Sequence, residues 1–202
     1  KEEGGREAQK RLVYLAIAFN HALRHRLRES DAWGDIEKYV APTDLEVLRQ
    51  SKNLPDCLLH LMGRKLIACR NQKLLSDVLV QSIDKQVTSM AGVLAACERI
   101  QNTPLPFAYM LLVHRTAYLY CFILPFGLVA SLGFVTPLVC ATVAYAFFGL
   151  DALSEELEEP FGLSPNDLPL SAMSRTIEIN LLDALGEMDL PSPLLPNEHS
   201  IQ

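Results

Sequence analysis

The sequence predicts an all-α, polytopic membrane protein. Two long apolar runs follow each other with almost no charge, residues 107–130 (FAYMLLVHRTAYLYCFILPFGLVA) and 132–150 (LGFVTPLVCATVAYAFFGL), while helical periodicity flanks them and strand signals are absent. Each run approaches the roughly 20 residues that a helix needs to cross a hydrocarbon core about 30 Å thick. We therefore expect a cytosolic helical region over 1–106, a transmembrane helical hairpin over 107–150, and an acidic turn, a short helix and a C-terminal arm over 151–202.

Composition separates a very apolar part of the chain from a charged remainder. The 202 residues are 50% hydrophobic and 21% charged, with a formal net charge of −6 at pH 7. Binding to nucleic acid requires a clustered basic face, and Lys and Arg are here interspersed with acids, so no nucleic acid partner is expected. The single basic cluster, residues 24–28 (RHRLR), is typical of a helix C-terminus, where cations complement the dipole.

The cysteines and the N-terminus carry two further expectations. The five cysteines form no CxxC pair and have no ligand-like spacing to the histidines. We interpret them as free thiols, and we expect neither a metal site nor a cofactor. The chain opens at Lys1 without an initiator Met or a signal peptide, and we expect that an N-terminal portion is missing.

The first half of the chain contains a series of predicted helices. Residues 6–29 place apolar side chains at three- and four-residue steps, which predicts an amphipathic helix of about six turns. Thr43 and Glu46 have the spacing of a capping box, with Thr43 as the N-cap. A further helix is predicted over 53–71, because Pro55 suits the first turn, where its missing N–H is not needed.

A long helix over 74–100 is predicted to precede the membrane hairpin. Pro104 and Pro106 end it, since proline disfavours helical conformation in the preceding residue and donates no hydrogen bond. The hairpin turn, near residues 130–133, carries no charge, whereas the flanking helices hold the Lys and Arg residues. By the positive-inside rule the turn faces outward and the remaining mass faces the cytoplasm.

After the hairpin the sequence changes to acidic and then to turn-forming residues. The acids at 155–159 either gather a hard cation or form a solvated helix end beside a partner-binding turn. Residues 160–169 read as a rigid connector, and Ile177, Ile179, Leu181 and Leu182 indicate a short amphipathic helix. The proline-rich tail, residues 191–196, is predicted to be an extended arm that lies on another surface.

Two ionisable residues within the first apolar run are candidate functional residues. His114 and Arg115 lie about two turns into the run, where exposure to lipid costs several kcal/mol. The pair is therefore expected to face protein, either in a functional role or as an Arg that snorkels or pairs with an acid of a neighbouring helix. Pro125 and Pro137 predict kinks in the two runs.

A catalytic site is not predicted. His21 and His25 have the i, i+4 spacing that lets two imidazoles meet one metal or haem iron, but no carboxylate or cysteine has a matching offset. They are interpreted as a solvated or packed pair. Because no nucleophile elbow, phosphate-binding loop or catalytic triad can be assembled, we do not expect an enzyme.

Three segments together resemble the bestrophin family of pentameric ion channels, in particular its bacterial branch. They are residues 96–109 (ACERIQNTPLPFAY), 114–127 and 155–162 (EELEEPFG), the last followed by 166–170 (NDLPL). The residues that carry the resemblance are Glu98, Arg99, Pro104, Pro106, Glu156, Glu159, Pro160, Phe161, Gly162, Asn166 and Asp167. It covers essentially the whole chain and places residue 1 well inside the family's pattern, so the family's first membrane helices and pore neck would precede this sequence.

The resemblance implies a homopentamer in the bacterial inner membrane, with a pore that widens into a cytosolic vestibule. It places the family's lower aperture at Val78, where copies of a β-branched side chain form a constriction that can limit hydrated ions by dewetting. Ser82 and Lys85 lie on the same helical face as candidate vestibule wall residues. Val78 as an ordinary core residue remains the alternative. The expected partners are identical subunits, lipid and small inorganic ions.

Selectivity and regulation follow less directly from the resemblance. Family members in animals and plants conduct chloride, bacterial relatives can favour cations, and the acidic net charge points weakly toward cations. The carboxylates of the calcium clasp found in animal members are mostly absent from residues 163–167, so no tight calcium site is expected. The competing hypotheses are a membrane-anchored haem or quinone carrier that uses His21, His25, His60 and His114, and a scaffold without a pore.

Overall fold

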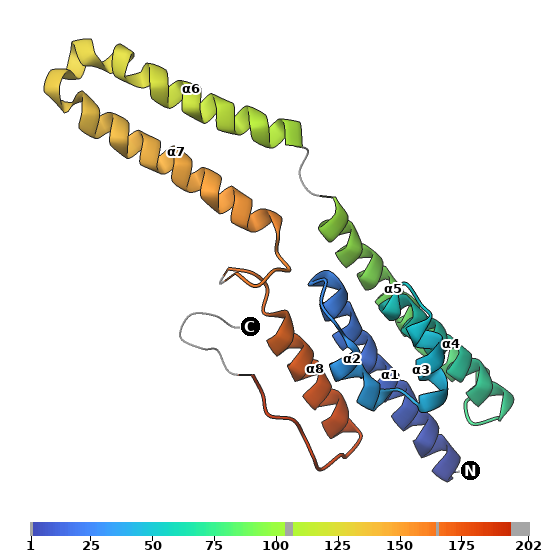
Figure 1. Ribbon diagram of the computed structural model, residues 1–202. Coiled ribbons are helices and arrows are strands. Elements are labelled where there is room, and N and C mark those ends of the chain that lie inside the picture. Colours follow the sequence, from blue (N-terminus) through green and yellow to red (C-terminus); the bar gives the residue numbers. More distant parts are fainter. Residues whose placement is uncertain (1, 104–106, 165, 195–202) are drawn as a thin grey trace. The chain divides into compact units, whose positions relative to one another are not determined.

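The computed structural model describes residues 2–103, 107–164 and 166–194, and the chain forms two compact units (Figure 1). The core unit comprises Lys1–Gln101 and Phe161–Gln202, and the hairpin unit comprises Asn102–Pro160. All regular secondary structure in the described residues is helical. The predicted all-α class is thus confirmed.

Helix α1 (Glu2–Leu27) is the centre of the core unit. It packs along α4 (Leu54–Asn71) and against α8 (Leu170–Ala184). Apolar side chains at helical spacing on α1 and α4 make up most of the core: Leu15, Ile17, Ala18, Phe19, Ala22, Leu58, Leu59, Leu61 and Met62. Their amphipathic pattern explains why these segments are stable as helices only when packed together.

Short helices connect α1 to α4 and contribute Ile36, Tyr39 and Leu48 to the core. They are α2 (Trp33–Ile36), η1 (Glu37–Tyr39) and α3 (Pro42–Arg49). The predicted N-cap at Thr43 is wrong: Ala41 is the extended N-cap residue, and Pro42 opens the helix. Proline fixes φ at a helical value and needs no N–H partner there, so it sets the start without a side-chain cap.

The start of α4 follows the prediction closely. Asn53 is the N-cap, and its side chain accepts a hydrogen bond from the backbone N–H of Asp56 at 3.2 Å. Pro55 lies in the first turn as predicted, and the helix ends at Asn71. The side-chain cap satisfies one of the otherwise unpaired N–H groups of the first turn.

Helix α5 (Asp77–Asn102) begins three residues later than predicted. The preceding turn holds Lys73 in the left-handed region with φ of 57°, which prevents an earlier helical start. Ser76 marks the true boundary, because its hydroxyl oxygen accepts from the N–H of Leu79 at 3.4 Å.

The hairpin unit consists of α6 (Phe107–Leu132), the turn η2 (Gly133–Val135) and α7 (Thr136–Glu158). Gly133 takes a positive φ of 51° in the turn, which costs glycine little. Aromatic contacts join the two helices, with ring centroids 5.1 Å apart for Tyr118 and Phe148. The turn therefore begins at Gly133, the last residue of the predicted range, and extends to Val135.

The hairpin is apolar on its outside as well as between its helices. Segment Ala108–Ser154 is long and apolar enough to cross a membrane, with a mean hydropathy of 2.1 in a window that is only 6% buried. Apolar side chains exposed in this way are stable in contact with the hydrocarbon core of a bilayer. Pro125 lies inside α6, whereas Pro137 lies in the first turn of α7 and starts that helix, so the kink predicted there is wrong.

Candidate ion path and its supporting contacts

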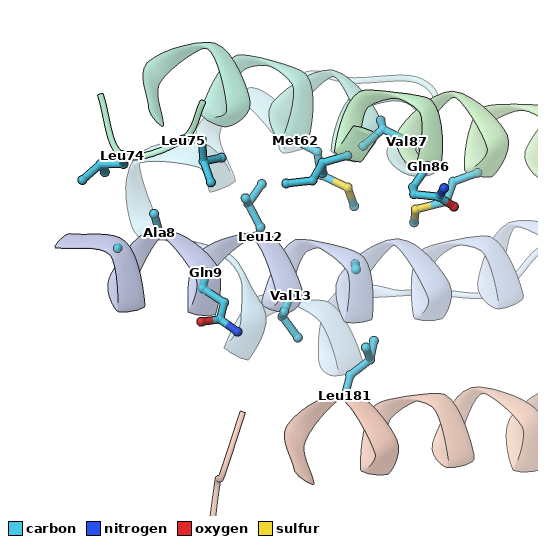
Figure 2. A pocket seen from close by; sticks show the side chains of 14 residues that line it. Ala8, Gln9, Leu12, Val13, Met62, Leu74, Leu75, Gln86, Val87 and Leu181 are labelled. Atoms are coloured by element: carbon cyan, nitrogen blue, oxygen red, sulfur yellow. The ribbon is translucent and has the colours of Figure 1, made fainter. Parts of the chain in front are cut away.

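Helix α5 presents two chemically different faces. One face contributes apolar side chains to the core unit: Leu94 is buried, and Val87 and Met90 pack against the buried cluster. Val87 and Gln86 also line an apolar cavity of about 430 Å³ between α1, α4 and α5, opposite Leu12 of α1 (Figure 2). This inward face fixes the rotation of α5 about its own axis.

The predicted pore residues lie on the opposite face of α5. Val78 is 76% exposed, and Ser82 and Lys85 are also exposed. Because an α-helix turns by about 100° per residue, all three project within about 60° of one another and point away from Val87. Val78 therefore lies outside the buried core of the described residues.

Contacts at both ends of α5 hold it in this rotation. At the start of the helix, Arg70 Nε lies 2.6 Å from Asp77 Oδ1. At its end, the Glu98 carboxylate accepts from Asn53 Nδ2 at 3.0 Å and from Arg26 Nε at 3.4 Å. Glu98 thus joins α5 to the C-terminal turn of α1 and the first turn of α4, which gives this predicted signature residue a structural role.

The rest of the first motif, after Glu98, is only partly covered by the structure. Gln101, beside them, donates to the carbonyl oxygen of Leu27 at 3.0 Å and adds a second tie to α1. Arg99 is exposed. Pro104 and Pro106 lie outside the described residues.

The connector after α7 is organised by one arginine. Arg28 donates to the carbonyl oxygens of Phe161 at 3.3 Å and Leu168 at 3.4 Å, and to Ser171 Oγ at 2.8 Å. Phe161 is buried, so its ring and its carbonyl are both held by the core unit. The sequence had assigned the basic cluster around Arg28 only to a helix end, and its role in this turn was missed.

The remaining signature residues surround this turn. The Asp167 carboxylate accepts from the backbone N–H of Ser164 at 2.6 Å, which closes the loop. Burial lowers the pKa of Arg28 and nearby Arg24 adds to that effect, while Asp167 opposes it. In the described residues Gly162 and Pro160 are partly buried, and Asn166, Glu156 and Glu159 are exposed.

In the hairpin unit the structure separates the predicted polar pair. His114 Nε2 lies 2.9 Å from Asp151 Oδ2 of α7, and His114 Nδ1 is 3.2 Å from the carbonyl oxygen of Met110. Arg115 is exposed on α6. The acid partner that the sequence left unnamed is therefore Asp151, and it pairs with the histidine.

A buried carboxylate in the core unit was not predicted. Glu178 of α8 has no exposed surface and accepts from Tyr39 Oη, from Lys38 Nζ at 3.1 Å and from Arg175 Nη1 at 2.9 Å. His21 Nε2 of α1 lies 3.2 Å from Glu178 Oε2, and the two side chains are 3% and 0% exposed. We call these five residues the Glu178 cluster; it joins α1, η1 and α8.

Burial and pairing shift the ionisation of this cluster in opposite directions. Burial raises the pKa of Glu178, but the hydrogen bonds from Tyr39 and Lys38 outweigh it and hold that pKa below its ordinary value. Burial lowers the pKa of His21 more strongly than the nearby Glu178 raises it. Burial and the bond to Glu178 both raise the pKa of Tyr39. The cluster is thus a carboxylate with two cations and a neutral imidazole at neutral pH.

The histidines proposed for a haem or quinone carrier each have their own partners. His25 bonds to Ser30 and Asp35, and His60 is exposed near Asp56 at 3.5 Å. His21 belongs to the Glu178 cluster, and His114 belongs to the hairpin unit. Across the described ranges no group of three His, Cys, Asp or Glu side chains has a metal-binding arrangement.

An apolar helical hairpin and a helical core unit with one outward polar helix face define an all-helical membrane protein. The family model for the Bacterial/Fungal Bestrophin protein matches residues 1–183. The chain belongs to the bestrophin family.

Named relatives and solved structures agree with this assignment. The chain is 44% identical over 186 residues to the voltage-dependent anion channel-forming protein YneE of Salmonella typhi, and 44% identical over 190 residues to the voltage-dependent anion channel-forming protein mll4386 of Mesorhizobium japonicum. These matches cover 92% and 94% of the chain but 61% and 60% of the relatives, so the chain spans about three fifths of their length. A crystal structure of a bacterial bestrophin homolog from Klebsiella pneumoniae matches with a TM-score of 0.85 at 40% identity, over 91% of this chain and 68% of that one.

Proposed function

We propose that the chain is a subunit of a homopentameric channel that conducts small monovalent anions passively across a bacterial membrane. The relatives that it resembles are named as anion channel-forming proteins. The observation that carries the proposal is the exposed face of α5, on which Val78, Ser82 and Lys85 follow one another.

Val78 is the proposed aperture. It lies in the first turn of α5, and its side chain is 76% exposed. Five copies around one axis form an apolar ring, and a narrow ring of this kind limits ions because water leaves it readily. The resemblance to the family supports the choice of the same residue.

Ser82 and Lys85 are the proposed wall of the vestibule. They follow Val78 by four and seven residues, which keeps them on one face of the helix. The ties of Glu98 to Arg26 and Asn53 support this function indirectly, because they fix the rotation of α5 and hence the direction of its exposed face.

Identical subunits are the proposed partners that complete the pore. Helix α5 exposes further apolar side chains, with Leu79 at 53% and Ile100 at 52%. Apolar surface of this kind is stabilised by burial against a neighbouring chain. The hairpin unit is proposed to lie in the bilayer and the core unit in the cytoplasm, as the distribution of Lys and Arg favours.

The test is conductance of the full-length protein in planar bilayers, with Val78→Ala as the variant. Removing two methyl groups from each copy widens the ring, so the permeability of large anions should rise relative to chloride. Val47→Ala is the matched control, because Val47 is an exposed valine of α3, outside the proposed path. A wild-type pentamer that carries no current would refute the function, and equal effects of both substitutions would refute the aperture.

A further inference from the structure

The outward face of α5 carries charge of one sign. An α-helix turns by about 100° per residue, so the angle of each side chain around the axis can be compared with that of Lys85. Between Val78 and Ala96, eight residues lie within about 60° of Lys85. All eight are exposed: Val78, Gln81, Ser82, Lys85, Thr88, Ser89, Gly92 and Ala96. We call them the outward stripe, and Lys85 is its ionisable member. Beyond Ala96 the exposed Arg99 lies on the same face, about 40° from Lys85 around the axis, and its charge has the same sign.

The carboxylates of α5 lie elsewhere on the helix. Asp84 is about 100° from Lys85 around the axis, and Asp77 is about 80° away. Asp77 is moreover paired with Arg70, with 2.6 Å between Oδ1 and Nε. Glu98 faces the core unit, where it bonds to Asn53. No acid of this helix therefore neutralises the outward stripe.

Lys85 also lacks a local partner that would hold it. The residues three and four positions away on the helix surface are Gln81, Ser82, Thr88 and Ser89, which are all neutral. No ion pair or hydrogen bond to its ammonium group is formed in the part of the chain that the structure describes. A solvated ammonium on a flexible stem acts as a point charge toward mobile ions.

We propose that Lys85 determines the preference of the channel for anions over cations. This inference rests on the proposed function, which places the outward stripe on the vestibule wall. Five ammonium groups around one axis would raise the local concentration of anions and lower that of cations, since like charges that line a confined aqueous space focus the field. Val78 then limits the size of the ion, and Lys85 selects the sign of its charge.

The test compares reversal potentials of wild type, Lys85→Gln and Lys85→Arg in the full-length protein under a tenfold KCl gradient. An ideally selective channel for one charge would reverse at roughly 59 mV. Lys85→Gln should lower the ratio of chloride to potassium permeability on the order of 3- to 10-fold, and Lys85→Arg, which keeps the charge, should retain it. Asp84→Asn is the control, because it removes a charge next to Lys85 in sequence that projects from another face.

Salt provides a second readout that a purely structural effect would not move. The Debye length is about 30 Å at 0.01 M and about 3 Å at 1 M, so the difference between wild type and Lys85→Gln should shrink when both solutions are made more concentrated. An equal difference at low and high salt would contradict electrostatic selection by Lys85.

The outcomes separate this inference from the proposed function. A conducting wild type whose reversal potential is unchanged by Lys85→Gln overturns the inference and leaves the channel intact. A loss of the pentamer in Lys85→Gln but not in Lys85→Arg overturns it too, because Lys85 would then lie in a subunit contact. A wild-type pentamer without any current overturns both.

Discussion

Replacement of Glu178 by glutamine removes the negative charge of the Glu178 cluster while it keeps the size of the side chain. The variant leaves Lys38 and Arg175 facing a neutral amide, and it gives Tyr39 one acceptor oxygen in place of a carboxylate. We expect α8 to detach from α1 more often, because this buried carboxylate is a polar link between the two helices and η1, beside the bond from Asn20 Nδ2 to the carbonyl oxygen of Ser174.

The magnitude follows from the exposure of each partner. A hydrogen bond to a charged group contributes about 1.5–3 kcal/mol, and removing one partner of a buried ion pair costs about 3–5 kcal/mol. Lys38 is 54% exposed and Arg175 is 27% exposed, so both can turn toward water and recover part of this cost. We therefore expect the free energy of local opening of α8 to fall by about 2–4 kcal/mol, which speeds its amide exchange by about 30- to 900-fold.

Native-state hydrogen exchange measured by mass spectrometry on the purified protein checks this prediction. Peptides from α8 and from the facing part of α1 should lose protection, while peptides from the hairpin unit should not. Asp183→Asn is the control, since Asp183 is an exposed acid of the same helix. Unchanged exchange of α8 in Glu178→Gln, or equal changes in both variants, would refute the assigned role of the cluster.

Two further predictions concern protonation and the membrane hairpin. Folding lowers the pKa of His21 and of Glu178, so the unfolded state binds more protons in acid. The free energy of unfolding should therefore fall as the pH drops below about 6.5 because of His21, and fall again below the ordinary pKa range of Glu178. Each group contributes at most about 1.4 kcal/mol per pH unit. Thermal denaturation in detergent between pH 8 and 5 measures this slope, and an identical slope in His21→Gln would contradict it. Asp151→Asn should weaken the contact to His114 across the hairpin by about 0.6–1.7 kcal/mol, the range of interhelical hydrogen bonds in membranes. Unfolding by sodium dodecyl sulfate measures the loss, and equal curves for Asp151→Asn and wild type would show that the contact contributes nothing.

Features with a local physical cause were predictable from the sequence. The hairpin was found because a run such as 107–130 is longer and more apolar than a core helix requires, and the structure places α6 and α7 there. The start of α4 was found because Asn53 and Pro55 have fixed preferences at the first helical turn. Val78 was singled out only through the family resemblance, and the structure supplies its exposure.

Features that depend on packing were missed or wrong. Ile177 was counted among the apolar residues of α8 but is 41% exposed, while Glu178 beside it is fully buried. Hydrophobicity alone ranks the two in the opposite order, and the buried carboxylate is stable because Tyr39 and Lys38 of η1 and Arg175 of α8 donate to it. A signal was present in the i, i+4 positions of Ser174 and Glu178, which share the buried face of α8.

The formal net charge of the chain does not describe the charge of a single helix face. The formal charge of −6 sums all residues, and it pointed weakly toward cations. An ion in a vestibule responds most to the charges within about one Debye length of its path, about 8 Å at physiological salt. On α5 the carboxylates of Asp77 and Glu98 are held by Arg70 and by Asn53, and Asp84 projects about 100° away from Lys85, so the charge at the centre of the outward stripe is that of Lys85. The distribution of charge over helix faces, and not its sum, therefore governs which ion such a wall attracts.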